Sequence, residues 1–168
     1  MPDAVPMRTI VFVCTGNICR SPLAEAMATQ RAPDVLAADG RPLAELVHFE
    51  SAGTASWHVG DAMDPRAHRA LLDAGYSPHD HEAQHAGDEL LARADLLVAL
   101  DRKHRQILSG RATSAREIVM LRPFDPAASG RVDVADPYYG TDVDFSECAT
   151  TIERCVAGLL AKIAAGAL

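Results

Sequence analysis

The sequence lacks the cysteine pairs that build structural zinc sites. Its four cysteines are Cys14, Cys19, Cys148 and Cys155, and no two of them are separated by only two residues. Cys-x2-Cys spacings are typical of such sites, so we expect no bound metal. In a reducing compartment all four residues would be thiols, and each needs its own explanation.

Long apolar runs are also absent. The first run, from Ile10 to Val13, is too short for the hydrophobic region of a signal peptide and no cleavage site follows it. The apolar stretch 155–168 is interrupted by Lys162 and is too short to span a bilayer. We therefore expect no membrane span and a cytoplasmic protein, with export without a signal left open.

Positive charge is scarce as well. The 168 residues include 16 Lys and Arg against 23 Asp and Glu, a net charge of −7. A broad nucleic-acid-binding surface is therefore not expected. An anionic ligand would have to be attracted locally, by backbone N–H groups and one or two arginines. The length fits a single domain over residues 1–168.

Short hydrophobic runs alternate along the chain with segments of helical spacing. The runs predict buried strands at residues 9–13, 46–50, 96–100 and 118–121. This alternation predicts βαβ units, so the expected fold is α/β, with a parallel sheet and helices on both faces. Ligands in such folds bind beyond the carboxyl ends of the strands.

Helix starts and stops are visible between these runs. Ser21 and Pro22 are expected to be the N-cap and first residue of a helix. Asp64 and Pro65 open a second helix, which Gly75 ends. The remaining predicted helices are a short one at residues 102–108 and a long C-terminal one with an apolar stripe at Phe145, Cys148, Ile152, Cys155, Leu159 and Ile163.

The segment after the first strand carries the strongest chemical signal. It reads Cys14-Thr15-Gly16-Asn17-Ile18-Cys19-Arg20-Ser21-Pro22. Gly and Asn tolerate unusual backbone conformations, so the loop can turn N–H groups inward as an anion cradle before a helix N-terminus. Cys14 would ionise readily there, and Arg20 offers a planar fork to two phosphoryl oxygens. The nucleotide-binding P-loop is excluded because its Gly-Lys-Ser/Thr ending is absent.

A thiolate that attacks a phosphate monoester needs a proton donor for the leaving group. Such a donor typically accelerates the reaction about 10²–10⁴-fold. Asp136 is the candidate, because it opens an Asp-Pro-Tyr-Tyr-Gly segment in which Pro137 restricts its backbone. Asp-Pro also occurs at Asp64 and Asp125, so taken alone Asp136 reads as a surface turn.

These two segments together resemble the signature segments of the low-molecular-weight protein tyrosine phosphatases. The resemblance covers nearly the whole chain and is closest to actinobacterial members. It implies a four-stranded parallel sheet with helices on both sides and a phosphate-binding loop after the first strand. It also implies hydrolysis of protein phosphotyrosine through a phosphocysteine, without a cofactor. The further matching segments are Ser51-Ala52-Gly53, Trp57-His58-Val59-Gly60, Asp64-Pro65-Arg66-Ala67 and Ala99-Leu100-Asp101.

The resemblance assigns roles to individual residues. Cys14 would attack phosphorus, Arg20 would bind the equatorial oxygens, and Asp136 would protonate the phenol and then activate water. The phosphate-binding loop would comprise Thr15, Gly16, Asn17, Ile18, Cys19 and Ser21, with Ser21 hydrogen-bonded to the thiolate. Trp57, Tyr138 and Tyr139 would wall a slot for the phenyl ring, opposite Ile18. Ser51 and His81 would support Asn17, and Asp101 would lie behind the site.

Other histidines, the second cysteine and the tyrosine pair carry separate expectations. His48, His68, His85 and His104 are expected at the solvated surface. Cys19 either packs as a small apolar group or traps an oxidised Cys14 as a reversible disulfide. Besides a tyrosine-phosphorylated protein substrate, the expected partners include a tyrosine kinase that phosphorylates Tyr138 and Tyr139.

Two alternative functions remain. The thioredoxin-coupled arsenate reductases share this fold and loop but need two further redox cysteines near the site. Cys148 and Cys155 lie two helical turns apart, about 10 Å, which is too far for a disulfide without unwinding. A phosphate-binding module without catalysis would need neither Cys14 nor Asp136.

Overall fold

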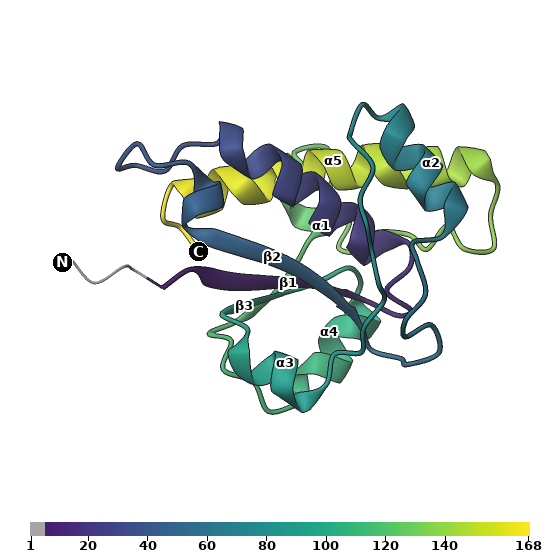
Figure 1. Ribbon diagram of the computed structural model, residues 1–168, viewed down its shortest axis with the longest axis horizontal. Coiled ribbons are helices and arrows are strands. Elements are labelled where there is room, and N and C mark those ends of the chain that lie inside the picture. The colour runs from purple at the N-terminus through teal and green to yellow at the C-terminus, as the bar shows by residue number, and fades with distance from the viewer. Residues whose placement is uncertain (1–5) are drawn as a thin grey trace.

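The computed structural model describes residues 6–168, which form a sheet covered by helices on both faces (Figure 1). All strand pairs are parallel, and the strand order is β2-β1-β3-β4. The predicted α/β fold with four parallel strands is confirmed. The strands are β1 (Arg8–Cys14), β2 (Val47–Gly53), β3 (Leu96–Ala99) and β4 (Ile118–Met120).

The helices divide into two groups, one on each face of the sheet (Figure 1). The first face carries α1 (Arg20–Arg31), α2 (Pro65–Asp73) and α5 (Asp142–Ala164), and the second carries α3 (Asp88–Arg93) and α4 (Arg102–Ser109). Short 3₁₀ helices complete the structure at Ala32–Asp34, Leu43–Glu45 and Arg122–Phe124.

Strand β1 lies inside the sheet and is buried on both faces. Ile10 and Phe12 pack in the core beneath α1 and α5, whereas Val11 and Val13 pack in the second core, beneath α3 and α4. All four side chains are fully buried. Because both faces are covered, β1 reads as a continuous apolar run rather than an alternating one.

The first helix begins differently from the prediction. Helix α1 starts at Arg20, and the residue at its N-cap is Cys19, which makes no side-chain capping bond. The prediction of Ser21 as N-cap was wrong, because the Ser21 hydroxyl bonds to Cys14 and Asn17 instead. At α2 the prediction is confirmed, since the Asp64 side chain accepts from the backbone N–H of Arg66.

Strand β2 runs farther than predicted, through Ser51 and Ala52 to Gly53. Gly53 pairs with Cys14 and permits a close approach, because a Cβ there would lie 2.5 Å from the carbonyl oxygen of Thr15. The end of β2 therefore supports the loop that follows β1. Helix α3 was not predicted, since its six residues are too few for a clear periodic pattern.

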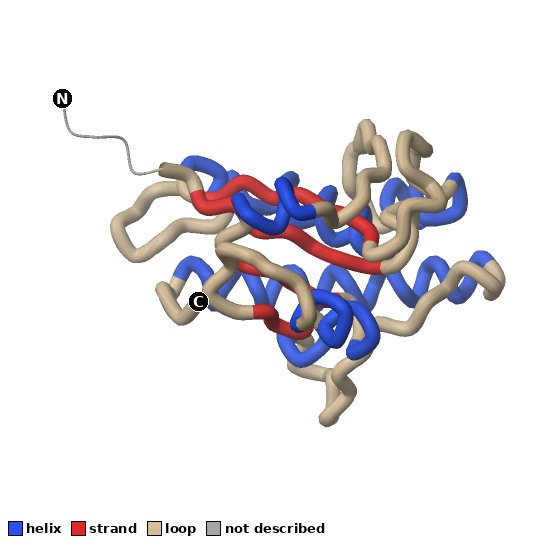
Figure 2. The backbone as a smooth tube through the Cα atoms, turned by 90° about the horizontal axis from the view of Figure 1, so that it is seen from below, coloured by secondary structure: helices blue, strands red, loops and turns tan. Residues whose placement is uncertain are grey.

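The carboxyl ends of β1 and β2 point toward one end of the molecule, where several long loops gather (Figure 2). The last residue, Leu168, lies at the opposite end, where its carbonyl oxygen accepts from Nη1 of Arg8 at the start of β1. Within residues 6–168, no helix is both long and apolar enough to cross a membrane.

Candidate active site

A pocket of about 330 Å³ opens where β1 ends. Its walls come from the loop between β1 and α1, the loop after β2, the start of α4 and the loop before α5. This is the position at which parallel α/β sheets usually bind ligands. The lining residues are Cys14, Thr15, Gly16, Ile18, Cys19, Arg20, Trp57, His58, Lys103, Asp136, Tyr138 and Tyr139.

The thiol of Cys14 sits at the last position of β1 and is almost fully buried. Its Sγ lies 2.9 Å from Oγ of Ser21. The Ser21 hydroxyl also accepts a hydrogen bond from Nδ2 of Asn17 at 2.8 Å, so its own proton can point toward sulfur at 2.9 Å or toward the more distant Ala52 carbonyl oxygen at 3.5 Å. Ser21 can therefore donate to a Cys14 thiolate.

Asn17 holds the loop in shape. Its φ of 56° lies in the left-handed region, which asparagine tolerates better than most residues. Nδ2 donates to the hydroxyls of both Ser21 and Ser51, at 2.8 and 2.9 Å, while Oδ1 accepts from the backbone N–H of Gln84. The backbone carbonyl of Asn17 accepts from Nε2 of His81 at 2.6 Å. This fully buried residue thus links the loop to β2 and to the segment before α3.

The hydrogen bonds continue away from the pocket to α1. Oγ of Ser51 donates to Oε1 of Glu25 at 3.1 Å, and Oε2 of Glu25 lies 2.5 Å from Nε2 of His79. A line of hydrogen bonds therefore runs from Cys14 through Ser21, Asn17 and Ser51 to a carboxylate on the far side of the loop.

Arg20 is held by two acceptors. Its Nη1 donates to Oδ2 of Asp101 and to the carbonyl oxygen of Val134, both at 2.9 Å. Burial opposes its charge, but Cys14 and the hydrogen bond to Asp101 together raise the pKa of Arg20, so it remains a cation. Within the described residues every hydrogen bond of Arg20 leaves from Nη1, and Nη2 has only a longer contact of 3.5 Å with Oδ2 of Asp136, so Nε and Nη2 can both bind an anion.

Asp101 is itself fixed at the start of α4. Its carboxylate accepts from the backbone N–H of His104 and forms the N-cap of the helix. Partial burial opposes ionisation, but the hydrogen bond from Arg20 and the contact with His104 hold the pKa of Asp101 below its usual value. The carboxylate therefore faces Arg20 as an anion.

The structure distinguishes the three Asp-Pro segments. Asp64 caps α2, and Asp125 is buried against Arg122 and Arg154. Asp136 instead lines the pocket of Cys14, half exposed, with Oδ2 3.5 Å from Nη2 of Arg20. Among the described residues, Asp136 is thus the one Asp-Pro carboxylate that shares the pocket with the thiol.

Aromatic side chains form the outer wall of the pocket. Trp57 and Tyr139 are largely exposed, and the rings of Tyr138 and Tyr139 meet edge to face at 5.0 Å. The guanidinium of Arg66 lies 5.5 Å from the centre of the Tyr138 ring and is bonded to the Asp64 carboxylate. Helix α2 therefore steadies the loop that carries Asp136.

His104 corrects one prediction. It was expected at the surface with three other histidines, but its side chain is fully buried, whereas His48 is exposed. Nδ1 accepts from the backbone N–H of Asp101, and Nε2 lies 2.8 Å from Oγ1 of Thr15. Burial and the charge of Arg20 lower the pKa of His104 to about 4, so the neutral ring donates to Thr15.

The other three cysteines are poor candidates for thiolates. Cys19 lines the pocket, but burial and the nearby Asp64 raise the pKa of its thiol far above its usual value. Burial also raises the pKa of Cys148 to about 12 and that of Cys155 to about 11. Both lie on the buried face of α5, within the core, as free thiols.

Four residues near the pocket were not predicted. Lys103 and His58 line it, Arg66 contacts Tyr138, and Gln84 bonds to Asn17. Lys103 adds a second positive charge to the pocket that Arg20 lines, in keeping with the local attraction that an anion needs in a protein of net charge −7. The Arg102-Lys103 pair following Asp101 was the available signal for this second cation.

The chain is similar to known proteins over nearly its whole length. The sequence profile described as low molecular weight phosphotyrosine protein phosphatase matches residues 9–167. Low molecular weight protein-tyrosine phosphatase A of Mycobacterium tuberculosis is 48% identical over 151 residues, covering 89% of this chain and 88% of that relative. A low molecular weight protein-tyrosine-phosphatase of Streptomyces coelicolor is 44% identical over 158 residues, covering 92% of each. The crystal structure of a protein tyrosine phosphatase from Entamoeba histolytica has a TM-score of 0.84 and 28% identity, covering 96% of this chain and 99% of that one.

Proposed function

The chain belongs to the low molecular weight phosphotyrosine protein phosphatase family, and from this we propose that it hydrolyses protein phosphotyrosine through a phosphocysteine on Cys14. One observation carries the proposal. Cys14 and Arg20 lie at the two ends of the loop between β1 and α1, and Asp136 lies far along the chain before α5, yet all three line the same pocket. Those are the nucleophile, the anion ligand and the proton donor that phosphoryl transfer to a thiol needs.

In the first step the Cys14 thiolate attacks phosphorus while the bond from phosphorus to the phenolic oxygen breaks. Nε and Nη2 of Arg20, with backbone N–H groups of the loop, bind the equatorial oxygens. Asp136 gives its proton to the departing phenolate. The Ser21 hydroxyl, 2.9 Å from Sγ, stabilises the thiolate before attack and as a leaving group.

In the second step water attacks the phosphocysteine. The Asp136 carboxylate, now deprotonated, takes a proton from that water, and the bond between phosphorus and sulfur breaks. Cys14 returns as a thiolate and inorganic phosphate leaves. No redox change occurs, and each proton has a donor and an acceptor.

The pocket walls suit an aryl phosphate. Trp57, Tyr138 and Tyr139 can contact the phenyl ring, and Ile18 supplies an apolar surface. The exposed rim leaves room for the rest of a protein substrate. We further propose that residues 1–168 act as one phosphatase domain, that the protein works in the cytoplasm without nucleic acid, and that a tyrosine kinase is a second partner.

The general-acid role of Asp136 is tested with two leaving groups. Asp136→Ala should slow hydrolysis of phenyl phosphate by about 10²–10⁴-fold, because the phenolate leaves unprotonated. A dinitrophenyl phosphate, whose leaving group is a much weaker base, should be slowed far less. Asp133→Ala is a matched control, since Asp133 lies in the same loop but pairs with Arg102. Equal losses with both substrates would contradict the assignment.

The nucleophile and the alternative functions are tested together. Cys14→Ser should abolish turnover without added metal, while Cys148→Ser and Cys155→Ser should retain the wild-type chemistry apart from any loss of stability. A binding module would show no turnover in the wild-type protein. Robust arsenate reduction with a thioredoxin system, lost on substitution of Cys148 or Cys155, would favour the reductase instead.

A further inference from the structure

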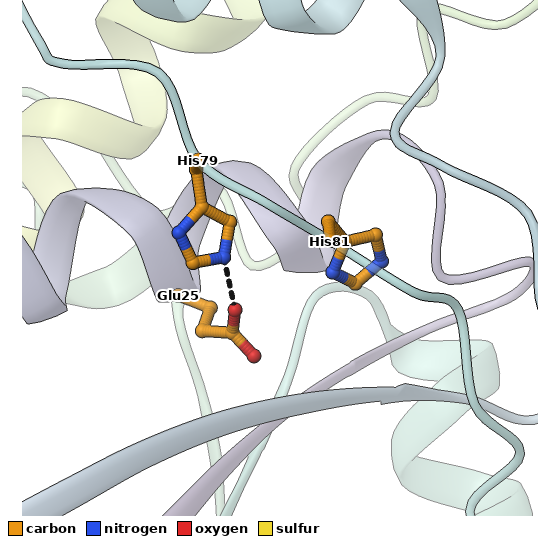
Figure 3. Close-up of side chains that lie close together, drawn as sticks. All are labelled: Glu25, His79 and His81. Carbon is orange, nitrogen blue, oxygen red and sulfur yellow. Dashed lines mark hydrogen bonds and ion pairs between the residues drawn. The ribbon is translucent and has the colours of Figure 1, made fainter.

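Glu25, His79 and His81 form a cluster beside the active-site loop. Glu25 lies on α1, and the two histidines lie on the segment between α2 and α3. One potential ligand atom from each residue lies within 4.8 Å of the other two. Figure 3 shows the two imidazoles hanging from the same segment, with the carboxylate rising toward them from α1.

The hydrogen bonds leave the right atoms available for a cation. Nε2 of His81 lies 2.6 Å from the Asn17 carbonyl oxygen, which can only accept, so Nε2 carries the proton. In the neutral ring Nδ1 therefore has a free lone pair, and within residues 6–168 it has no hydrogen-bond partner. Metal-binding histidines commonly donate their other N–H to a backbone carbonyl, which fixes the ring. His81 has this arrangement already.

The other two ligands are held together by a proton that a metal can replace. Nε2 of His79 lies 2.5 Å from Oε2 of Glu25 (Figure 3). When the neutral His79 ring carries its proton on Nδ1, Nε2 and the carboxylate oxygen both present lone pairs side by side. The two side chains are 19% and 15% exposed, so a cation and a water molecule can reach them.

From this geometry we propose that Glu25, His79 and His81 bind a zinc-like divalent cation. Two imidazoles and one carboxylate, with a water in the fourth position, are an established ligand set for Zn²⁺. Bonds of about 2.0–2.2 Å in a tetrahedron place ligand atoms about 3.3 Å apart. The His79 and Glu25 atoms, now 2.5 Å apart, must therefore separate slightly, and any pair near the 4.8 Å limit must close in by about 1.5 Å. Torsions of the flexible Glu25 and partly exposed His79 side chains can supply that movement.

The proposed site is connected to the active-site loop. Oε1 of Glu25 accepts from Ser51, and Ser51 accepts from Asn17, whose amide also bonds to Ser21. A cation that draws Glu25 toward the histidines would weaken its bond to Ser51 and loosen the support of Asn17. We therefore expect the bound cation to slow turnover. This effect on turnover rests on the proposed phosphatase function, whereas the binding of the cation is independent of it.

The binding test removes the thiol that would compete for metal. Zn²⁺ is titrated calorimetrically into the Cys14→Ser protein, and Co²⁺ is followed by its visible absorption. One saturable site is expected, and His79→Gln or His81→Gln in that background should weaken Zn²⁺ binding at least tenfold. His85→Gln is the matched control, because His85 lies on the same segment but bonds to the Thr54 carbonyl. Its affinity should equal that of the parent.

Three results would overturn the metal site. The first is that Cys14→Ser shows no saturable Zn²⁺ binding. The second is that neither His79→Gln nor His81→Gln changes the Zn²⁺ affinity. The third is that His85→Gln lowers the Zn²⁺ affinity as much as they do. Thermal unfolding guards against a folding defect, because Zn²⁺ should raise the Tm of Cys14→Ser but not that of Cys14→Ser with His79→Gln. None of these measurements uses phosphatase activity, so they can fail independently of the proposed function.

The coupling to catalysis is tested in proteins that retain Cys14. Low Zn²⁺ concentrations should slow hydrolysis of an aryl phosphate by the native protein, and His79→Gln should require at least tenfold more Zn²⁺ for the same inhibition. His85→Gln should remain as sensitive as the native protein. Equal inhibition of all three proteins would show that Zn²⁺ acts at the Cys14 thiol, and the coupling would be wrong.

Discussion

Nη1 of Arg20 donates a hydrogen bond to Oδ2 of Asp101 over 2.9 Å, and the same nitrogen reaches the carbonyl oxygen of Val134. The two acceptors come from segments far apart in the sequence, Asp101 at the start of α4 and Val134 in the loop that carries Asp136. Together they fix the plane of a side chain that is almost fully buried. Nε and Nη2 of the guanidinium are thereby held in position at the pocket before any ligand binds.

Asp101→Asn tests this positioning of Arg20. The variant keeps the size of the side chain but removes the charge, and a hydrogen bond to a charged group contributes about 1.5–3 kcal/mol. We expect kcat/KM for an aryl phosphate to fall about 10–100-fold. Asp95→Asn is the control. Asp95 immediately precedes β3, accepts from the backbone N–H of Thr9, and does not line the pocket. Wild-type kinetics in Asp101→Asn would contradict the positioning role.

Asn17 is tested by comparing glycine with alanine. Both variants lose the amide that bonds to Ser21 and Ser51, so both should lose at least tenfold in kcat/KM. The left-handed backbone at this position also destabilises the alanine variant by about 1–2 kcal/mol, whereas glycine adopts it without strain. Urea unfolding should therefore rank Asn17→Gly as more stable than Asn17→Ala.

Ser129 supplies a matched comparison for that experiment. It has a φ of 51° and is exposed, outside the pocket. Ser129→Gly should leave turnover unchanged and should not destabilise the protein. If Asn17→Gly were as active as the native protein, the amide of Asn17 would not be supporting the loop.

His104 should make stability depend on pH. Histidine in an unfolded chain titrates near pH 6.5, whereas burial and the charge of Arg20 lower the pKa of His104 to about 4. Between those values the unfolded chain binds a proton that the native protein does not, so stability falls as the pH falls from about 6.5 to about 4. The full effect is about 3 kcal/mol.

The measurement is urea unfolding of native protein and His104→Asn at pH 7.5 and 4.5. The difference in the free energy of unfolding between the two proteins should shrink at the lower pH. Only the native protein is destabilised there by the proton that His104 binds in the unfolded chain. His48→Asn, at an exposed position, should parallel the native protein at both values. Parallel behaviour of His104→Asn would refute the assignment.

Tyr139 should be the main acceptor if a tyrosine kinase modifies this loop. Its side chain is 97% exposed, whereas Tyr138 is partly buried beneath the guanidinium of Arg66. Tyr139→Phe should therefore remove most phosphate incorporation by a tyrosine kinase, and Tyr138→Phe should remove less. Unchanged incorporation in the double Phe variant would exclude both tyrosines.

The sequence predicted those parts of the fold that depend on local pattern. The strand β1 is apolar throughout because both faces are buried, and α2 carries its own signals in Asp64 and Gly75. The short α3 lacks such a pattern. Ser21 was misread as an N-cap, because a hydroxyl at a helix start usually caps, whereas here it bonds to Cys14 and Asn17.

Contacts between distant segments explain what sequence reasoning missed at the site. The burial of His104 depends on its bond to Thr15, 89 residues earlier, which no local pattern reveals. The pairing of Glu25 with His79 joins residues 54 apart. The proposed cation site had no signal in the cysteine spacing, which does not bear on histidine and carboxylate ligands. Asp136 could be chosen among three Asp-Pro segments only by resemblance, whereas the fold separates them by position.

The exposed rim of the pocket has a consequence for how the enzyme can diverge. Trp57 is 78% exposed and Tyr139 is 97% exposed, so neither contributes much to the folded core. Their exchange should therefore cost little stability and, on the proposed function, should alter which phosphoproteins are preferred. Asn17 and Ser51, buried among their hydrogen bonds, do not offer that freedom. Substrate range and chemical step can thus evolve separately on this scaffold.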